Sequence, residues 1–448
     1  MHNLCLFVQF VFDLFKVLYF VDVKFISNFS VFRILCVSLH VFCSRVAGLA
    51  VYCLLGMNRR NIFIILLIAL ICAPLQRVKG SERAFVSLLT CSPGDEVYAF
   101  FGHTALRYCN PDKGLDWVFN YGVFDFSEPN FVGKFVSGET DYMLGIVEFP
   151  YFIQEYAMRG SAVVEQELAF DSLQRERLFA LLRENYRPAN RIYRYNYFYN
   201  NCTTKARDII EAALGDGASI KYPENADRRD SFRRTVHCFT AVSPWYSFGI
   251  DLLLGCEADA QQDARTLQFI PSTLQADFSA ASIVCSDSVV PLLARTETLI
   301  EAVPAESGAA LWFTPTLFFV ILLLAVVLVA VVERRMGRIF WGIDLLLMTA
   351  QGVAGVVVAY MLLFSQHPTV GGNLLIILLN PLPLLILPIY IYSIVKGRKP
   401  QILWLQAAMA LLFIVSAPLL PQYIPMPLYV FAATLLIRTN FILLNNRK

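Results

Sequence analysis

The chain has 448 residues, of which 57% are hydrophobic and only 16% are charged. A typical soluble domain carries about 25% charged and about 45–50% apolar residues, so an ordinary soluble enzyme is excluded. The net charge of +2 divides unevenly, because residues 1–80 carry +6, residues 81–310 carry −11 and residues 311–448 carry +7. A nucleic-acid partner is not expected, since the folded domain of such a protein should be the basic one. We predict an integral membrane protein with a large soluble domain.

A signal-like segment lies at residues 57–80. Met57 is followed by Arg59 and Arg60, then by the apolar stretch 62–73 and by a small-residue site that ends at residue 80. This order is typical of a secretory signal peptide, and an uncleaved anchor helix is the alternative. Either one sends the chain from residue 81 onward across the membrane. Residues 1–56 are an apolar extension with nine Phe, and we expect Met57 to be the true first residue.

The exported domain is expected to span residues 81–300. Residues 84–170 alternate aromatic and β-branched residues with turn signals, which is typical of strands. Within them, residues 99–108 and 117–124 flank an Asn-Pro-Asp-Lys-Gly turn and predict a hairpin. Residues 173–185 and 203–214 come next, with apolar positions at helical spacing. The sequence therefore predicts an α+β domain.

Cys202 and His103 carry the clearest chemical signal in this domain. Cys202 directly precedes the predicted helix 203–214, where free N–H groups and the helix dipole lower the pKa of a thiol. His103 stands on the first strand of the predicted hairpin. A Cys–His pair is an activated nucleophile, with the imidazole as base and then acid. The alternative is a structural role, because six cysteines in an exported domain could form disulfides.

A third polar group should orient the imidazole. If the hairpin turns at Lys113, residues 120–123 lie opposite His103, and the side chains of Asn120 and Tyr121 point to opposite faces. We expect Asn120 to reach the ring. His237 is the second histidine of the domain and the alternative base. No CxxC pair is present, and neither a metal nor a cofactor is predicted. The candidate supporting residues are Tyr121, Asn201, Arg107 and His237.

Beyond a linker at 301–310, residues 311–448 read as a transmembrane domain of five helices. Lys and Arg follow the first, third and last spans and are missing from the other two connections. The positive-inside rule therefore places the soluble domain outside and the C-terminus in the cytoplasm. The apolar stretches of bilayer-crossing length are about 311–332, 339–363, 373–395, 401–418 and 421–440.

Four polar residues stand out in or beside these spans. Intramembrane ionisable residues are functional candidates, but Asp344 and Arg438 lie within reach of the inner surface. We therefore expect Asp344 near the interface and Arg438 snorkelling to it. Asn380 stands beside two prolines in the third span. His367 is expected at the outer surface, facing the soluble domain.

The motifs of the soluble domain resemble a known family. His on a strand, a polar residue on the next strand and Cys at the start of a helix is the order of circularly permuted papain-like enzymes. More specifically, several segments resemble the Lnb lipoprotein N-acyltransferase family, over roughly residues 84–445. They are Phe-Gly-His-Thr-Ala-Leu-Arg at 101–107, Asn-Tyr-Gly-Val-Phe-Asp-Phe at 120–126, Tyr-Phe-Tyr-Asn-Asn-Cys-Thr-Thr at 197–204, Gly-Ile-Asp-Leu-Leu-Leu-Gly at 249–255, and Asn380 with Pro381.

The resemblance implies acyl transfer in two stages. Cys202 would take an acyl chain from a membrane phospholipid as a thioester, and the α-amine of a diacylglyceryl-cysteine lipoprotein would then accept it, with His103 moving the protons. It also implies a bacterial inner-membrane protein with its catalytic domain in the periplasm. The alternative is a membrane-anchored cysteine peptidase or amidase that acts on cell-wall or protein substrates. A third possibility is a non-catalytic sensor or scaffold, which would need no thiol at 202.

Overall fold

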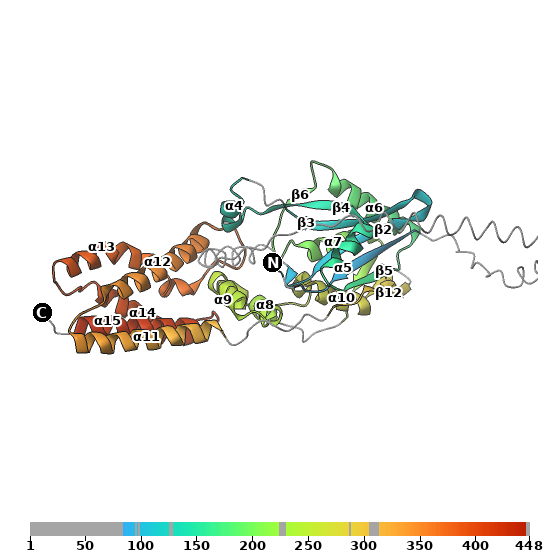
Figure 1. Ribbon diagram of the computed structural model, residues 1–448. Coiled ribbons are helices and arrows are strands. Elements are labelled where there is room, and N and C mark those ends of the chain that lie inside the picture. Colours follow the sequence, from blue (N-terminus) through green and yellow to red (C-terminus); the bar gives the residue numbers. More distant parts are fainter. Residues whose placement is uncertain are drawn as a thin grey trace, which may run out of the picture. The chain divides into compact units, whose positions relative to one another are not determined.

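The computed structural model describes residues 84–94, 96, 99–124, 129–223, 230–285, 288–303 and 313–444. The predictions for residues 1–56 and 57–80, and for most of the 301–310 linker, lie outside these residues. The described part contains a mixed α/β domain followed by a helical region, as the sequence predicts (Figure 1).

A seven-stranded sheet forms the centre of the α/β domain. Its strand order is β12-β5-β1-β2-β3-β4-β6, and all neighbouring strands are antiparallel. The predicted hairpin is confirmed as β2 and β3, which pair Leu106 with Phe119 and turn through a short 3₁₀ helix, Pro111–Lys113. The strands are β1 Phe85–Cys91, β2 His103–Asn110, β3 Leu115–Val123, β4 Asp141–Glu148, β5 Val163–Leu168, β6 Ile192–Arg194 and β12 Leu293–Ile300.

Helices cover both faces of this sheet. The predicted helices are confirmed as α6 (Ser172–Tyr186) and α7 (Cys202–Leu214), and their apolar sides share one core with β1, β2 and β3. Helix α5 (Phe149–Met158) packs on the opposite face. It lies within the stretch for which the sequence predicts only strands. The other helices of the domain are α4 Phe131–Ser137, α8 Phe232–Thr240, α9 Pro244–Leu253 and α10 Pro271–Ala280.

Two small sheets complete the domain. One has the order β11-β10-β7, and the other pairs β8 with β9. Their strands are β7 Ala218–Lys221, β8 Asp230–Ser231, β9 Gln261–Gln262, β10 Ser282–Cys285 and β11 Ser288–Pro291.

Four helical segments of the C-terminal region are long and apolar enough to cross a membrane. They are α11 (Pro315–Met336), α12 (Trp341–Phe364), Leu374–Val395, whose second part is α13 (Leu382–Val395), and α15 (Met426–Leu444). The fourth predicted span, 401–418, forms a shorter apolar helix, α14 (Leu403–Ser416), so a count of five full spans is not confirmed.

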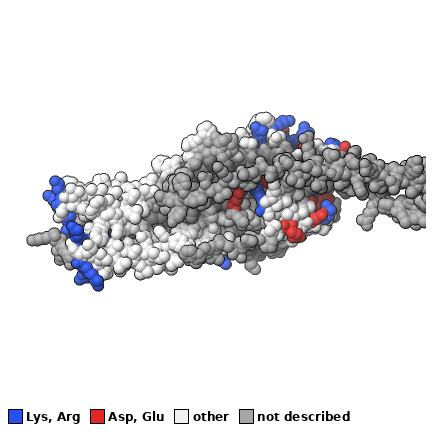
Figure 2. Space-filling model, viewed as in Figure 1, with Lys and Arg blue, Asp and Glu red and all other residues white. Residues whose placement is uncertain are grey.

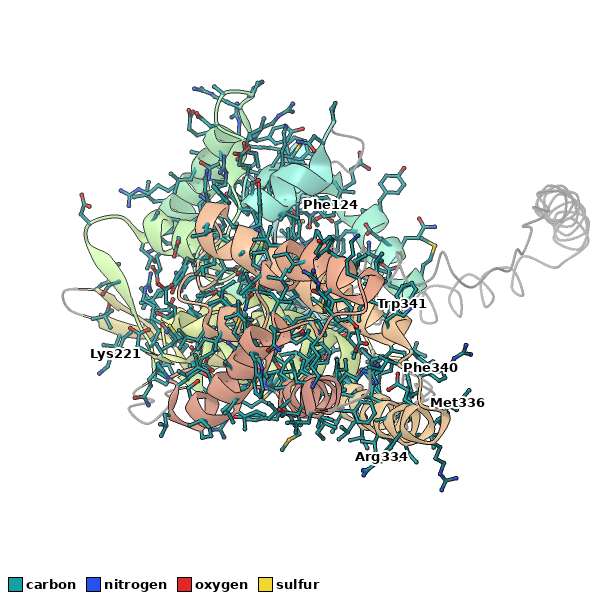
Figure 3. The ribbon with its side chains drawn as sticks, turned by 90° about the vertical axis from the view of Figure 1, so that its left-hand side faces the viewer. Phe124, Lys221, Arg334, Met336, Phe340 and Trp341 are labelled. Carbon is teal, nitrogen blue, oxygen red and sulfur yellow. The ribbon has the colours of Figure 1, made fainter. Side chains whose placement is uncertain are left out.

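The surface of this helical region fits a membrane. Figure 2 shows Lys and Arg gathered at one end of it, with an uncharged surface beyond them. Arg334 belongs to this basic end, and Figure 3 shows it at the close of α11, near Phe340 and Trp341 at the start of α12. An uncharged band beside a basic end is what lipid contact and the positive-inside rule require.

Arg438 does not snorkel, and this prediction is wrong. Its side chain is only 2% exposed and lies between Asp344, 2.6 Å from Nε, and Glu333, 2.9 Å from Nη2. Tyr390 donates a further hydrogen bond to Asp344 over 2.8 Å. Helices α11, α12 and α15 pack so that the two carboxylates neutralise the guanidinium inside the bundle. If Arg438 extended to the surface instead, Glu333 and Asp344 would be left buried without a cation.

The other two polar residues have structural contacts. The Asn380 amide donates to Ile376 and Ile377 carbonyls and accepts from the Leu382 N–H, which satisfies the backbone where the third span is interrupted. His367 faces the soluble domain, as expected, and its Nε2 lies 2.7 Å from the carbonyl oxygen of Phe135 in α4.

Candidate active site

Cys202 is the first residue of α7 and carries a buried free thiol. The preceding residue, Asn201, caps the helix, because its side-chain oxygen accepts the N–H groups of Thr203 and Thr204, each over 2.9 Å. The Asn201 amide also donates to the carbonyls of Tyr197 and Phe269. The start of the helix, and with it the thiol, is therefore fixed from several sides. Cys202 forms no disulfide, and its side chain also packs in the core shared by α6 and α7.

His103 is the first residue of β2 and contacts the thiol. The imidazole is hydrogen-bonded to Cys202, and its Nε2 lies 3.2 Å from the amide oxygen of Asn120 on β3. The expected contact of Asn120 with the ring is thus present. An amide oxygen can only accept, so it fixes the proton on Nε2 and leaves Nδ1 to take a proton from the thiol.

Gly102 allows the chain to enter β2 at this point. Its φ is +73°, and an added Cβ would lie 2.4 Å from the carbonyl oxygen of Cys91 on the neighbouring strand. A side chain would therefore be strained in conformation and would clash with backbone. The backbone conformation at the start of β2 therefore requires a glycine before His103.

The electrostatics favour an ion pair between the two groups. Burial raises the pKa of the Cys202 thiol, but the His103 imidazole and the Thr104 N–H outweigh it and lower that pKa to about 7. Burial lowers the pKa of His103, but the Cys202 thiolate and Asn120 together raise it. Both shifts have the same cause, since each ion stabilises the other.

The pair faces a cavity of about 340 Å³. Such a volume holds the reacting part of a substrate. Its wall combines aromatic rings with a few polar groups. The lining residues are Ser92, Ala99, Phe101, Gly102, His103, Tyr121, Gly122, Val123, Phe124, Tyr156, Arg159, Ser161, Tyr195, Asn201, Cys202, Thr203, Phe269 and Pro271.

Comparison with protein families identifies both parts of the chain. Residues 75–230 match the Lnb N-terminal periplasmic domain, and residues 306–448 match the Lnb transmembrane domain. The chain belongs to the Lnb-type family. It is therefore a membrane protein with a periplasmic N-terminal domain and a C-terminal transmembrane region. Searches of curated proteins and of solved structures each gave no match.

The other predicted site residues of this Lnb-type protein have different positions. Tyr121 lines the cavity, but its hydroxyl accepts a hydrogen bond from Asn185 and does not orient His103. Arg107 does not line the cavity, because Asp116 and Glu165 hold its guanidinium. His237 does not line it either, and its Nε2 lies 2.9 Å from Asp251. The alternative base is thus not brought to Cys202.

The Lnb-type site also contains residues that the sequence did not single out. The Tyr156 ring lies parallel to the His103 ring, with centroids 6.5 Å apart. Thr104 and Thr203 join β2 to α7 through their hydroxyls, 3.1 Å apart. Arg159 lines the cavity just beyond α5. Tyr156 lies on α5 and Arg159 directly follows it, in a stretch where the sequence predicts only strands. A correct prediction of this helix would have been needed to find them.

Proposed function

We propose that this protein is an acyltransferase that moves an acyl chain from a membrane phospholipid to the α-amine of diacylglyceryl-cysteine lipoproteins. The observation that carries the proposal is the row formed by the Cys202 thiol, the His103 imidazole and the Asn120 amide at a cavity. A nucleophile, its base and a group that orients the base are the requirements of covalent acyl transfer. Lnb-type membership and the attached membrane region favour lipid substrates.

In the first stage, the Cys202 sulfur attacks the ester carbonyl of the phospholipid while His103 takes the thiol proton. The carbon–oxygen ester bond then breaks, and His103 gives that proton to the departing lysophospholipid oxygen. The products are a thioester on Cys202 and a lysophospholipid. A thiol pKa of about 7 supplies thiolate at neutral pH, which is the nucleophilic form.

The oxyanion of this stage needs a hydrogen-bond donor. In the first turn of α7, the N–H groups of Thr203 and Thr204 go to the Asn201 side chain, and that of Lys205 goes to the Asn201 carbonyl. We assign the remaining first-turn donor, the Cys202 N–H, to the oxyanion. The helix dipole adds positive potential at the same point.

In the second stage, the neutral α-amine of the lipoprotein attacks the thioester carbonyl. His103 takes a proton from the attacking nitrogen and returns it to the leaving sulfur, which restores the Cys202 thiol and leaves an amide. An α-amine has an ordinary pKa of about 7.7–8.0, so part of it is neutral at pH 7. The imidazole thus acts as base and acid in both stages.

The proposed location is the inner membrane, with the C-terminus in the cytoplasm. The basic end of the helical region supports it, because Arg334, Arg335 and Arg338 lie around the turn between α11 and α12, and Lys396, Arg398 and Lys399 follow α13. By the positive-inside rule this end is cytoplasmic. The opposite connection, which contains His367, contacts the α/β domain.

The test uses cells that lack their own N-acylating enzyme. Expression of the full chain should give lipoprotein N-terminal peptides with an acylated α-amine by mass spectrometry. Cys202→Ala and His103→Ala should leave that amine free, whereas Cys238→Ala, which removes an exposed free thiol, should not. An unchanged product from Cys202→Ala would refute the mechanism. Peptide-bond cleavage without acylation would instead favour the peptidase or amidase.

A further inference from the structure

The cavity has a polar side next to His103. Arg159, Ser92 and Ser161 line it there. Ser92 and the segment after Arg159 are joined by backbone, since the Ser92 N–H donates to the Ala162 carbonyl over 2.9 Å, and the Ser92 hydroxyl accepts from the Ala162 N–H. The polar side is therefore a fixed part of the wall.

Arg159 brings a positive charge to this side. The Arg159 guanidinium carbon lies 5.3 Å from the centre of the Tyr156 ring, and that ring lies parallel to His103. Among the described residues that line the cavity, Arg159 is the one Lys or Arg. The segment 81–310 carries a net charge of −11, so the positive charge of Arg159 at the cavity is opposite in sign to that of the domain as a whole.

The part of the cavity wall next to Cys202 contains aromatic rings. A Cβ on Gly122 would lie 3.4 Å from the Tyr195 ring and 3.9 Å from the Cys202 Cβ. The Tyr195 ring packs against the Tyr142 ring, with centroids 4.5 Å apart, and Tyr142 packs against Phe124, with centroids 5.0 Å apart. Phe124 is labelled in Figure 3.

This aromatic side continues toward the membrane region. Tyr142 and Tyr195 belong to the same buried cluster as Met361 of α12 and Val370 of the following connection. A buried apolar cluster therefore connects Tyr195, which lines the cavity, with a membrane-spanning helix. The cavity thus offers the thiol both a cationic group and aromatic rings, which suits an amphiphile.

We propose that Arg159 binds the phosphate of the phospholipid donor, while the acyl chain to be transferred lies along the aromatic side. This inference rests on the proposed function and adds the orientation of its donor. In a glycerophospholipid the glycerol alone separates an acyl ester from the phosphate, and the acyl chain leaves the ester in the other direction. With the ester carbonyl at Cys202, the phosphate reaches the polar side and the chain reaches the rings.

The ion pair between Arg159 and Glu155 does not prevent this binding. The Arg159 guanidinium pairs with Glu155 over 2.5 Å, and both side chains are about half exposed. An exposed ion pair of this kind contributes little to stability. A phosphate accepts two parallel hydrogen bonds from the guanidinium fork, which makes a stronger contact.

The test measures acylation of Cys202 by mass spectrometry in the purified full-length protein. The donors are dioleoyl phosphatidylglycerol and dioleoylglycerol, which present the same esters with and without a phosphate. Arg159→Gln should slow acylation by the phospholipid about 10-fold to 100-fold, the range for a charge-assisted hydrogen bond. The loss should be confined to the phosphate-bearing donor, and Arg159→Lys should recover part of the rate.

Arg187→Gln is the matched control. Arg187 ends α6 as Arg159 ends α5, and it pairs with Glu184 of its own helix, but it does not line the cavity. This variant should acylate like the wild type. Equal losses of Arg159→Gln with both donors, or no loss with either, would overturn the role of Arg159. A wild-type protein that accepts neither lipid would instead refute the proposed acyltransferase.

Discussion

Two clusters of buried ionisable groups, one in the membrane region and one in the α/β domain, are satisfied in different ways. In the membrane region, Arg438 is enclosed by Glu333 and Asp344, and the Phe340 N–H and the Tyr390 hydroxyl supply further donors to the two carboxylates. In the α/β domain, His103 has one hydrogen bond to Asn120 and one to a thiol that faces a cavity.

The difference concerns what each cluster can still do. Breaking a buried ion pair leaves an uncompensated charge, so the membrane cluster gains nothing by changing partners. The Cys202–His103 pair exchanges a single proton beside an open space, and its charged and neutral forms lie close in free energy because the thiol pKa is about 7. We therefore expect the membrane cluster to govern stability and the thiol–imidazole pair to govern reactivity.

The largest expected effect is that of His103→Ala on the chemistry of Cys202. Acyl transfer should fall by about 10²–10⁴-fold, the usual contribution of a general acid–base. Because His103 holds the pKa of the Cys202 thiol down to about 7, its removal should raise that pKa. Iodoacetamide alkylation of Cys202 should be half-maximal near pH 7 in the wild type and should require a higher pH in this variant.

His237→Ala is the control, because His237 pairs with Asp251 away from the cavity. Its alkylation profile should match that of the wild type. If the two histidine variants had the same profile, His103 would not be the group that activates the thiol.

The next effect is that of Arg438→Leu on stability. This change strands two buried carboxylates and should cost about 3–5 kcal/mol of unfolding free energy. Unfolding in mixed detergent micelles measures it, with the exposed Arg398→Leu at the same end as the control. Adding Glu333→Gln and Asp344→Asn should restore part of the loss.

The assignment of stability to the membrane cluster and of reactivity to the thiol–imidazole pair would be wrong under one outcome. In that outcome, the Arg438→Leu variant unfolds like the wild type, but iodoacetamide no longer alkylates its Cys202 at neutral pH. That result would give the membrane cluster a part in the chemistry. The expected result is a lower unfolding midpoint with an unchanged alkylation profile for the folded fraction.

Local sequence patterns predicted the residues of the site, but they did not predict the tertiary packing around it. The turn at Lys113 and the alternation of a strand placed Asn120 or Tyr121 opposite His103, and the structure decided between them. The helical spacing of residues 203–214 located Cys202 at a helix start. These features depend on residues that are near in sequence, so the sequence alone can carry them.

The missed features depend on distant partners. Strand β12 joins the sheet beside β5, about 130 residues away in the chain, and no local signal marks that pairing. Glu333 precedes two arginines in the chain, but its partner is Arg438 of α15, 105 residues later. Helix α5 was hidden in a stretch patterned like strands, and with it Tyr156 and Arg159.

The smallest expected effect concerns the contact that links the two regions. The Tyr197 hydroxyl donates to the Pro368 carbonyl over 2.9 Å, and the Tyr197 carbonyl accepts from the Asn201 amide that caps the helix of Cys202. Tyr197→Phe removes one buried hydrogen bond and should cost about 1 kcal/mol. Hydrogen exchange at the start of α7 should rise several-fold, whereas Tyr199→Phe, at an exposed ring, should change nothing. Unchanged exchange in both variants would mean that the membrane region anchors the α/β domain without steadying its nucleophile.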